Sequence, residues 1–206
     1  MRPLTDHTPK PLISVHGQTL IERHITQLRE TGIREFVINL GWLGDKLRAA
    51  LGDGTRLGVQ IQYSQEGWPA LESGGGIFRA LPLLGDAPFV VVNGDIHVEF
   101  DWATFVKAPH NELAHLVLVP NPPHNRNGDF GLVNGRVVSA CSERFTFSGI
   151  SVLHPRLLEG QTGGAFPLAP VLRDAALRGQ VTGERFEGPW SDVGTPERLE
   201  KLLETP

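Results

Sequence analysis

The sequence lacks the features of several large classes of protein. Cys141 is the sole cysteine, which excludes a disulfide framework and a cysteine-rich metal site and is typical of a reducing compartment. No apolar run approaches the ~20 residues that a membrane-spanning helix needs, and the first residues lack the layout of a signal peptide. We therefore predict a cytoplasmic protein with no membrane partner.

Basic charge and common catalytic signatures are also scarce. The 19 Lys and Arg residues are outnumbered by 23 Asp and Glu, giving a net charge of −4. A nucleic-acid surface needs a basic patch to release counterions, so we predict no nucleic-acid partner. The eight histidines show no zinc-binding pattern. No Gly-x-Ser-x-Gly segment indicates a serine hydrolase.

The hydrophobic pattern predicts a single α/β domain over residues 1–206. The chain is 40% hydrophobic, enough to bury a sizeable core. Its periodicity predicts helices at 20–30, 43–51, 77–84, 101–107, 165–178 and 196–203, and strands at 35–40, 59–63, 88–93, 113–119, 130–133, 136–140 and 147–153.

The alternation of strands and helices favours a Rossmann-like, mostly parallel sheet with helices on both faces. The apolar run 88–93 is typical of a parallel strand that is covered on both faces. Asn134-Gly135 predicts a hairpin, and hence a small antiparallel insertion in the sheet.

Two distant aspartates are candidate metal ligands. Asn93-Gly94-Asp95 directly follows the strand predicted at 88–93, and Asp192 precedes the last predicted helix. Open α/β sheets bind ligands at the carboxyl ends of their strands, and Mg²⁺ takes one or two protein carboxylates together with water and phosphate oxygens. Either aspartate could instead be an ordinary turn or cap residue.

Lys10 and a glycine-rich segment are candidate phosphate-binding and nucleotide-binding groups. Lys10 lies between Pro9 and Pro11, which stiffen the backbone and disfavour a helix there. The run 71–77 reads LESGGGI and is predicted to be a loop that presents amide donors at the start of a helix. It is no P-loop, because no Gly-Lys-Ser/Thr follows. The alternatives are a solvated lysine and a flexible loop.

Together these segments resemble a known family. RPLT at 2–5, TPKPL at 8–12, the run 71–77, VVNGD at 91–95, TFSGI at 146–150 and WSDVGTPERL at 190–199 occur in family order. The chain resembles the bacterial sugar-1-phosphate nucleotidyltransferases. Within that family it most resembles the uridylyltransferases of peptidoglycan recycling, which act on N-acetylmuramate 1-phosphate. The resemblance implies the nucleotide-diphospho-sugar transferase fold.

The resemblance implies that a nucleoside triphosphate, here UTP, reacts with a sugar 1-phosphate, here N-acetylmuramic acid 1-phosphate, and releases pyrophosphate. The alternatives are a mannose- or glucose-1-phosphate nucleotidyltransferase and an inactive sugar-phosphate-binding relative. Asp95 and Asp192 would hold Mg²⁺, and Lys10 would neutralise charge on the transferred group. The nucleotide would lie at Glu72, Gly74, Gly75, Gly76 and Asn93, and the acceptor sugar at Asp129, Gly131, Glu143, Ser148 and Gly149.

Two departures from the family pattern accompany the resemblance. Many relatives carry Glu-Lys-Pro where this chain has Glu143-Arg144-Phe145. The family's first strand and glycine-rich phosphate loop normally precede RPLT, so we expect the fold without its first strand. We expect Met1 to be an internal methionine of a longer protein, the other reading being a shortened, inactive relative. The oligomeric state is left open.

Overall fold

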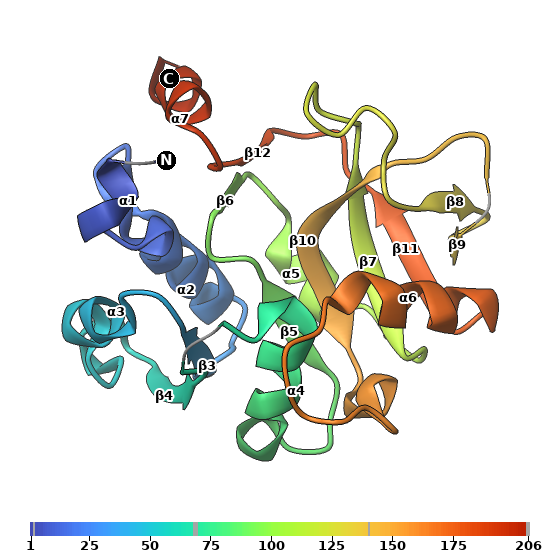
Figure 1. Cartoon of the computed structure of the whole chain (residues 1–206), viewed down its shortest axis with the longest axis horizontal. Coiled ribbons are helices and arrows are strands. Elements are labelled where there is room, and N and C mark those ends of the chain that lie inside the picture. The colour runs from blue at the N-terminus through green and yellow to red at the C-terminus, as the bar shows by residue number, and fades with distance from the viewer. Residues whose placement is uncertain (2, 68–69, 140, 205–206) are drawn as a thin grey trace. The chain divides into compact units, whose positions relative to one another are not determined.

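The computed structural model describes residues 1, 3–67, 70–139 and 141–204. Its contacts divide the chain into two compact units (Figure 1). Unit 1 comprises Met1–Ala70, Gly94–Lys107 and Pro189–Pro206, and unit 2 comprises Leu71–Asn93 and Ala108–Gly188. No helix within the described ranges is long and apolar enough to cross a membrane. One domain over residues 1–206 stays a prediction.

Unit 1 contains short strand pairs and several helices. The helices are α1 (Leu4–His7), the 3₁₀ helix η1 (Lys10–Leu12), α2 (Leu20–Glu30), α3 (Gly44–Leu51), the 3₁₀ helix η2 (Thr55–Leu57), α5 (Trp102–Lys107) and α7 (Pro196–Glu204). The strands are β1 (Ser14–Val15), β2 (Gln18–Thr19), β3 (Glu35–Leu40), β4 (Gln60–Gln65), β6 (Ile96–Val98) and β12 (Trp190–Asp192).

Helix α2 has the bounds that its apolar spacing predicts. Thr19 caps its first turn, since the Thr19 hydroxyl accepts from the Glu22 amide at 3.3 Å and donates to the Glu22 carboxylate at 2.8 Å. Its buried residues Ile21 and Ile25 belong to a core cluster that also contains Leu40 of β3. Strand β3 pairs in parallel with β4. Burial against these neighbours stabilises a helix too short to be stable alone.

Unit 2 is built on a six-stranded sheet with the order β5-β10-β7-β11-β9-β8. The strands are β5 (Phe89–Val92), β7 (Ala114–Val119), β8 (Gly131–Val133), β9 (Arg136–Val138), β10 (Thr146–Leu153) and β11 (Val181–Arg185). The helices are α4 (Glu72–Leu84), the 3₁₀ helix η3 (Pro155–Leu158) and α6 (Leu168–Leu177).

The α/β class is confirmed, since the chain contains both helices and strands. The sheet of unit 2 is mixed, however, so the prediction of a mostly parallel sheet is wrong. Strand β10 runs antiparallel to both β5 and β7, whereas β11 runs parallel to β7. Strand β5 is an end strand of this sheet and is only half-buried, so the expectation of a parallel strand covered on both faces is also wrong. An apolar run reports burial but carries no information about strand direction.

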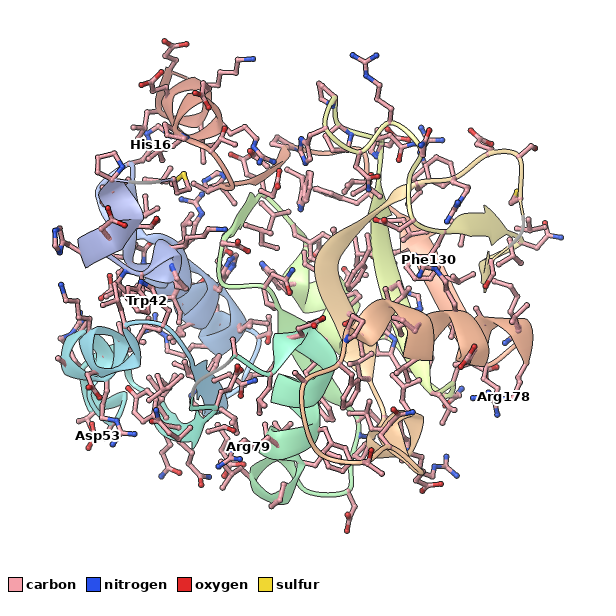
Figure 2. All side chains as sticks on the ribbon, viewed as in Figure 1. His16, Trp42, Asp53, Arg79, Phe130 and Arg178 are labelled. Carbon is pink, nitrogen blue, oxygen red and sulfur yellow. The ribbon has the colours of Figure 1, made fainter. Side chains whose placement is uncertain are left out.

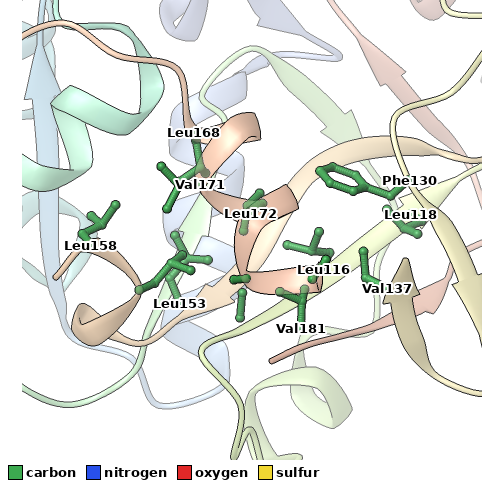
Figure 3. Packing of buried hydrophobic residues seen from close by; sticks show 14 of the residues in the cluster. Leu116, Leu118, Phe130, Val137, Leu153, Leu158, Leu168, Val171, Leu172 and Val181 are labelled. Atoms are coloured by element: carbon green, nitrogen blue, oxygen red, sulfur yellow. The ribbon is translucent and has the colours of Figure 1, made fainter. Parts of the chain in front are cut away.

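The core of unit 2 lies between α6 and the strands. Figure 3 shows Leu168 and Leu172 of α6 together with Leu116 of β7 and Val181 of β11, all of them buried. Phe130 is 1% exposed and has the largest fully buried side chain among the described residues. Figure 2 labels Arg178, which follows α6 as its C-cap. Burial of this apolar surface is the main stabilising contribution in unit 2.

Several local predictions are confirmed. Asn134 and Gly135 both have positive φ, at 50° and 74°, and join β8 to β9 as the hairpin predicts. Asp101 caps α5 by accepting from the Thr104 amide at 3.1 Å.

Helix α6 begins later than expected, because Pro167 is extended and forms its N-cap. Arg2 of the first motif and Ala140, at the end of the predicted strand 136–140, lie outside the described residues.

Candidate functional site

Residues of the second and fourth motifs of the family pattern, TPKPL at 8–12 and VVNGD at 91–95, meet in unit 1. The Lys10 ammonium donates to the Asp95 carboxylate over 3.2 Å, although the two residues are 85 positions apart. Beside this pair, a Cβ on Gly94 would lie 2.9 Å from Cγ of Pro11, so the absence of a side chain at Gly94 admits the proline ring. Pro11 lies in the three-residue 3₁₀ helix η1, so the prolines, which were expected to disfavour a helix there, allow one short 3₁₀ turn.

Asp192 is brought beside this pair by the backbone. Strand β12 pairs antiparallel with β6 in a register that places Asp192 opposite Ile96. The Val193 amide continues this pairing by donating to the Asp95 carbonyl over 2.7 Å. The start of β6 and the end of β12 therefore lie at the same end of the strand pair. The two aspartates, predicted from distant segments, come from neighbouring backbones.

A small apolar cluster holds these segments together. Val193 is fully buried and packs with Ile13 and Val15, which follow Lys10 in the chain, and with Leu20 at the start of α2. Leu199 of α7 packs partly buried against the same cluster. Because Val193 directly follows Asp192, its burial limits how far the Asp192 backbone can move relative to η1.

Arg198 is a site residue that the sequence analysis missed. Its guanidinium donates to the Asp192 carboxylate, and the two side chains are 25% and 30% exposed. A Cβ on Gly194 would lie 2.9 Å from the Arg198 guanidinium carbon. The spacing of Asp192, Gly194 and Arg198 at the start of a predicted helix was the available signal, but it does not reveal which carboxylate the arginine binds.

A buried histidine, His24, contacts the backbone of β6. His24 of α2 is 4% exposed and its Nε2 lies 3.0 Å from the Ile96 carbonyl oxygen. Its ring meets Trp102 edge-on with centroids 6.4 Å apart. Burial lowers the pKa of His24 to about 4, against a smaller raising effect of the Ile96 carbonyl. The ring is therefore neutral at physiological pH. The sequence signal was its position on the apolar side of α2.

The donor set of unit 1 suits Mg²⁺ rather than a transition metal. Asp95 and Asp192 supply carboxylate oxygens, and the described part of the chain has no group of three or more His, Cys, Asp or Glu that could hold a metal. Mg²⁺ usually takes one or two carboxylates and completes its shell with water and phosphate. Two partly exposed carboxylates leave room for such ligands.

The glycine run lies within a helix rather than in a loop, so the loop prediction for 71–77 is wrong. Helix α4 begins at Glu72, whose φ is +58°, and Gly74, Gly75 and Gly76 are buried in its first turns. The Gly75 amide donates to the Phe166 carbonyl at 3.0 Å. A Cβ on Gly74 would lie 2.8 Å from the same carbonyl oxygen. Close packing thus accounts for Gly74 and Gly75, and the contact of all three glycines with nucleotide stays a prediction.

Asn93 and Gly149, predicted on the nucleotide and acceptor sides, lie next to each other in unit 2. The Asn93 amide donates to the Gly149 carbonyl over 2.9 Å, and a Cβ on Gly149, whose φ is +85°, would lie 2.7 Å from the Asn93 side-chain nitrogen. The register of β10 shifts between Phe147 and Ser151. Ser148 lies in this irregularity and its hydroxyl accepts from the Ile150 amide at 3.1 Å. Such irregularities commonly orient side chains beside binding sites.

The remaining predicted acceptor residues have different surroundings. The Asp129 carboxylate accepts from the backbone amide of Phe147 at 2.8 Å and so joins the segment before β8 to β10. A Cβ on Gly131 would lie 2.8 Å from Cγ2 of Val138, which explains a glycine at this buried position. Glu143 is exposed. All nucleotide-side and acceptor-side residues thus belong to unit 2, whereas Lys10, Asp95 and Asp192 belong to unit 1.

Comparisons with known proteins bear on the family. A model described as nucleotidyl transferase matches residues 1–142. N-acetylmuramate alpha-1-phosphate uridylyltransferase of Neisseria meningitidis serogroup B is 46% identical over 209 residues, which cover 98% of this chain and 90% of that protein. The protein of the same name from Caulobacter vibrioides is 30% identical over 213 residues, covering 96% of this chain and 88% of that protein.

A solved structure supports the fold. The inositol-1-phosphate CTP transferase from T. maritima superposes with a TM-score of 0.76 over 100% of this chain and 91% of that chain, at 18% sequence identity. The resemblance noted in the motifs is confirmed, and the chain belongs to the nucleotidyl transferase family and has the nucleotide-diphospho-sugar transferase fold.

Proposed function

We propose that the chain transfers the uridylyl group of UTP to N-acetylmuramate 1-phosphate with Mg²⁺ and releases pyrophosphate, in the cytoplasm and in cell-wall recycling. The observation that carries the proposal is the contact of Lys10 with Asp95 beside the backbone of Asp192. The name of the Neisseria relative, which is 46% identical, supports this choice of base and sugar.

The reaction is a displacement at the α-phosphorus. An oxygen of the sugar phosphate forms a bond to the α-phosphorus of UTP, while the bond from that phosphorus to the bridging oxygen breaks and pyrophosphate leaves with its electrons. A phosphate monoester with a second pKa of about 6 is largely dianionic at neutral pH. No general base is therefore required, and the protein contributes alignment and charge stabilisation.

The residues of unit 1 supply charges of both signs for this step. Lys10 is 40% exposed at its side chain, so its ammonium can leave Asp95 and bind an oxygen of the transferred phosphate. Asp95 and Asp192 would hold Mg²⁺, which when bound supplies positive charge that offsets the negative charge of the triphosphate. The loop from Asp192 to Gly194 is kept in place by the buried Val193.

Pyrophosphate release tests the proposal. The full-length protein, with any residues that precede Met1, is mixed with UTP, Mg²⁺ and N-acetylmuramate 1-phosphate, and in parallel with glucose 1-phosphate, mannose 1-phosphate and the other nucleoside triphosphates. We expect release to be fastest with UTP and N-acetylmuramate 1-phosphate. No release with any sugar phosphate would refute the proposal, and preference for another pair would correct the substrate.

Substitutions test the metal assignment. Asp95→Asn and Asp192→Asn each remove one carboxylate charge at nearly constant shape, and we expect at least about a hundredfold loss of turnover because the loss of one preorganised group in a site costs about that much. The matched control is Asp86→Asn at an exposed aspartate of unit 2, which should retain full turnover. Wild-type turnover in both site variants would refute the assignment.

A further inference from the structure

Arg198 occupies a position that helix stability does not explain. It is the third residue of α7, and its amide donates to the Thr195 hydroxyl at 3.3 Å in the cap of the helix. The positive end of a helix dipole disfavours a cation in the first turn. A compensating contact is the Asp192 carboxylate, to which the Arg198 guanidinium donates.

Gly194 makes room for this contact. Its φ is not positive, so the backbone would accept another residue there. A Cβ on Gly194 would lie 2.9 Å from the guanidinium carbon of Arg198 and 3.3 Å from the Asp192 carboxylate oxygen. The guanidinium therefore lies against the bare Cα of Gly194, and a side chain there would require the guanidinium to shift.

The two candidate metal ligands are thus paired in the same manner. Lys10 donates to Asp95, and Arg198 donates to Asp192. A divalent cation that arrives alone must displace a positive charge from each carboxylate and remain close to both. A cation that arrives on a triphosphate brings negative oxygens to which the lysine and the arginine can transfer, and a guanidinium suits phosphate oxygens well.

We propose that Arg198 is a cation that exchanges between the Asp192 carboxylate and the phosphates of the nucleotide. It binds the carboxylate while no nucleotide is present, so that a divalent cation binds weakly alone. It transfers to phosphate oxygens when the cation and the triphosphate enter together. This inference rests on the proposed function, since it takes Asp192 to be a metal ligand.

Binding of Mn²⁺, followed by its electron paramagnetic resonance signal, tests the inference without turnover. The full chain is titrated alone and in the presence of UTP without acceptor sugar. Arg198→Met removes the charge at similar side-chain length. We expect Mn²⁺ alone to bind about tenfold more tightly, because the variant no longer has a partly exposed cation beside the metal ligand. Arg198→Lys retains a charge and should stay near the wild-type affinity.

Gly194→Ala provides a second, independent perturbation. It keeps the arginine but displaces the guanidinium from Asp192, so Mn²⁺ alone should again bind more tightly than in the wild type. UTP should raise the Mn²⁺ affinity of the wild type more than that of Arg198→Met, because the variant has no guanidinium to give to the phosphates. Circular dichroism establishes that each variant is folded.

Asp192→Asn tests the metal assignment of Asp192 separately from the role of Arg198. If Mn²⁺ binding survives Asp192→Asn unchanged, the metal assignment of the proposed function is wrong. If Asp192→Asn abolishes binding while Arg198→Met binds Mn²⁺ no more tightly than the wild type, the metal assignment stands and the role of Arg198 is overturned. A merely structural arginine gives this second result, because its removal would loosen Asp192 and weaken binding.

Discussion

Acidification is expected to destabilise the protein through His24. The ring is 4% exposed, and burial lowers its pKa in the fold from an ordinary 6.5 to about 4. His97 and Arg23 lower the pKa further, whereas the Ile96 carbonyl and Asp95 raise it. The unfolded imidazole takes up a proton near pH 6.5 and the folded one only near pH 4. Between these values the unfolded state binds more protons, so the free energy of unfolding falls as the pH falls.

The interval between the two pKa values fixes the magnitude. When the imidazole is fully protonated in the unfolded state and neutral in the folded state, the free energy of unfolding is lower by about 3 kcal/mol. About 2 kcal/mol of this is lost between about pH 8 and about pH 5, where most carboxylates remain ionised. A loss of that size is a large fraction of the stability of an ordinary domain.

Urea unfolding followed by circular dichroism at both pH values measures the effect. His24→Gln retains an amide that can donate to the Ile96 carbonyl but does not titrate, so the acid-induced loss should shrink by about 2 kcal/mol relative to the wild type. The matched control His7→Gln, at an exposed histidine, should leave the loss unchanged. If His24→Gln and the wild type lose equal stability on acidification, the argument from burial is wrong.

Three further substitutions test the packing and the cap of α2, the first of them against a matched control. Gly75→Ala should lower the free energy of unfolding by about 1–3 kcal/mol in urea, because its Cβ would overlap the Gly164 carbonyl; Gly163→Ala, whose Cβ would have its nearest neighbour at 3.9 Å, should be tolerated. Phe130→Ala should cost about 3–5 kcal/mol by the same assay, since the ring is 1% exposed. Thr19→Ala removes the cap of α2 and should cost about 1 kcal/mol; equal stability would contradict the capping contact.

Elements with a strong local pattern were predictable. Helix α2 and strand β3 have the bounds that the sequence predicts, because their apolar spacing and flanking residues are local signals. The glycine run was not, because glycine disfavours helix in isolation and the packing of Gly74 and Gly75 against residues 164–166 stabilises the first turns of α4. Strands β6 and β12 are three residues each and escaped notice.

Residue type and local order were enough to predict the α/β class, to find the family motifs and to select Lys10, Asp95 and Asp192 as candidate residues. The fold was needed to show that β12 pairs with β6, that Val193 is buried beside Asp192, and that the Arg198 guanidinium donates to that aspartate. The strand pairing and the packing of Val193 join segments far apart in the chain, and they position Asp192, which lies only six residues from Arg198. They are fixed by non-local backbone pairing and packing, which no local pattern encodes.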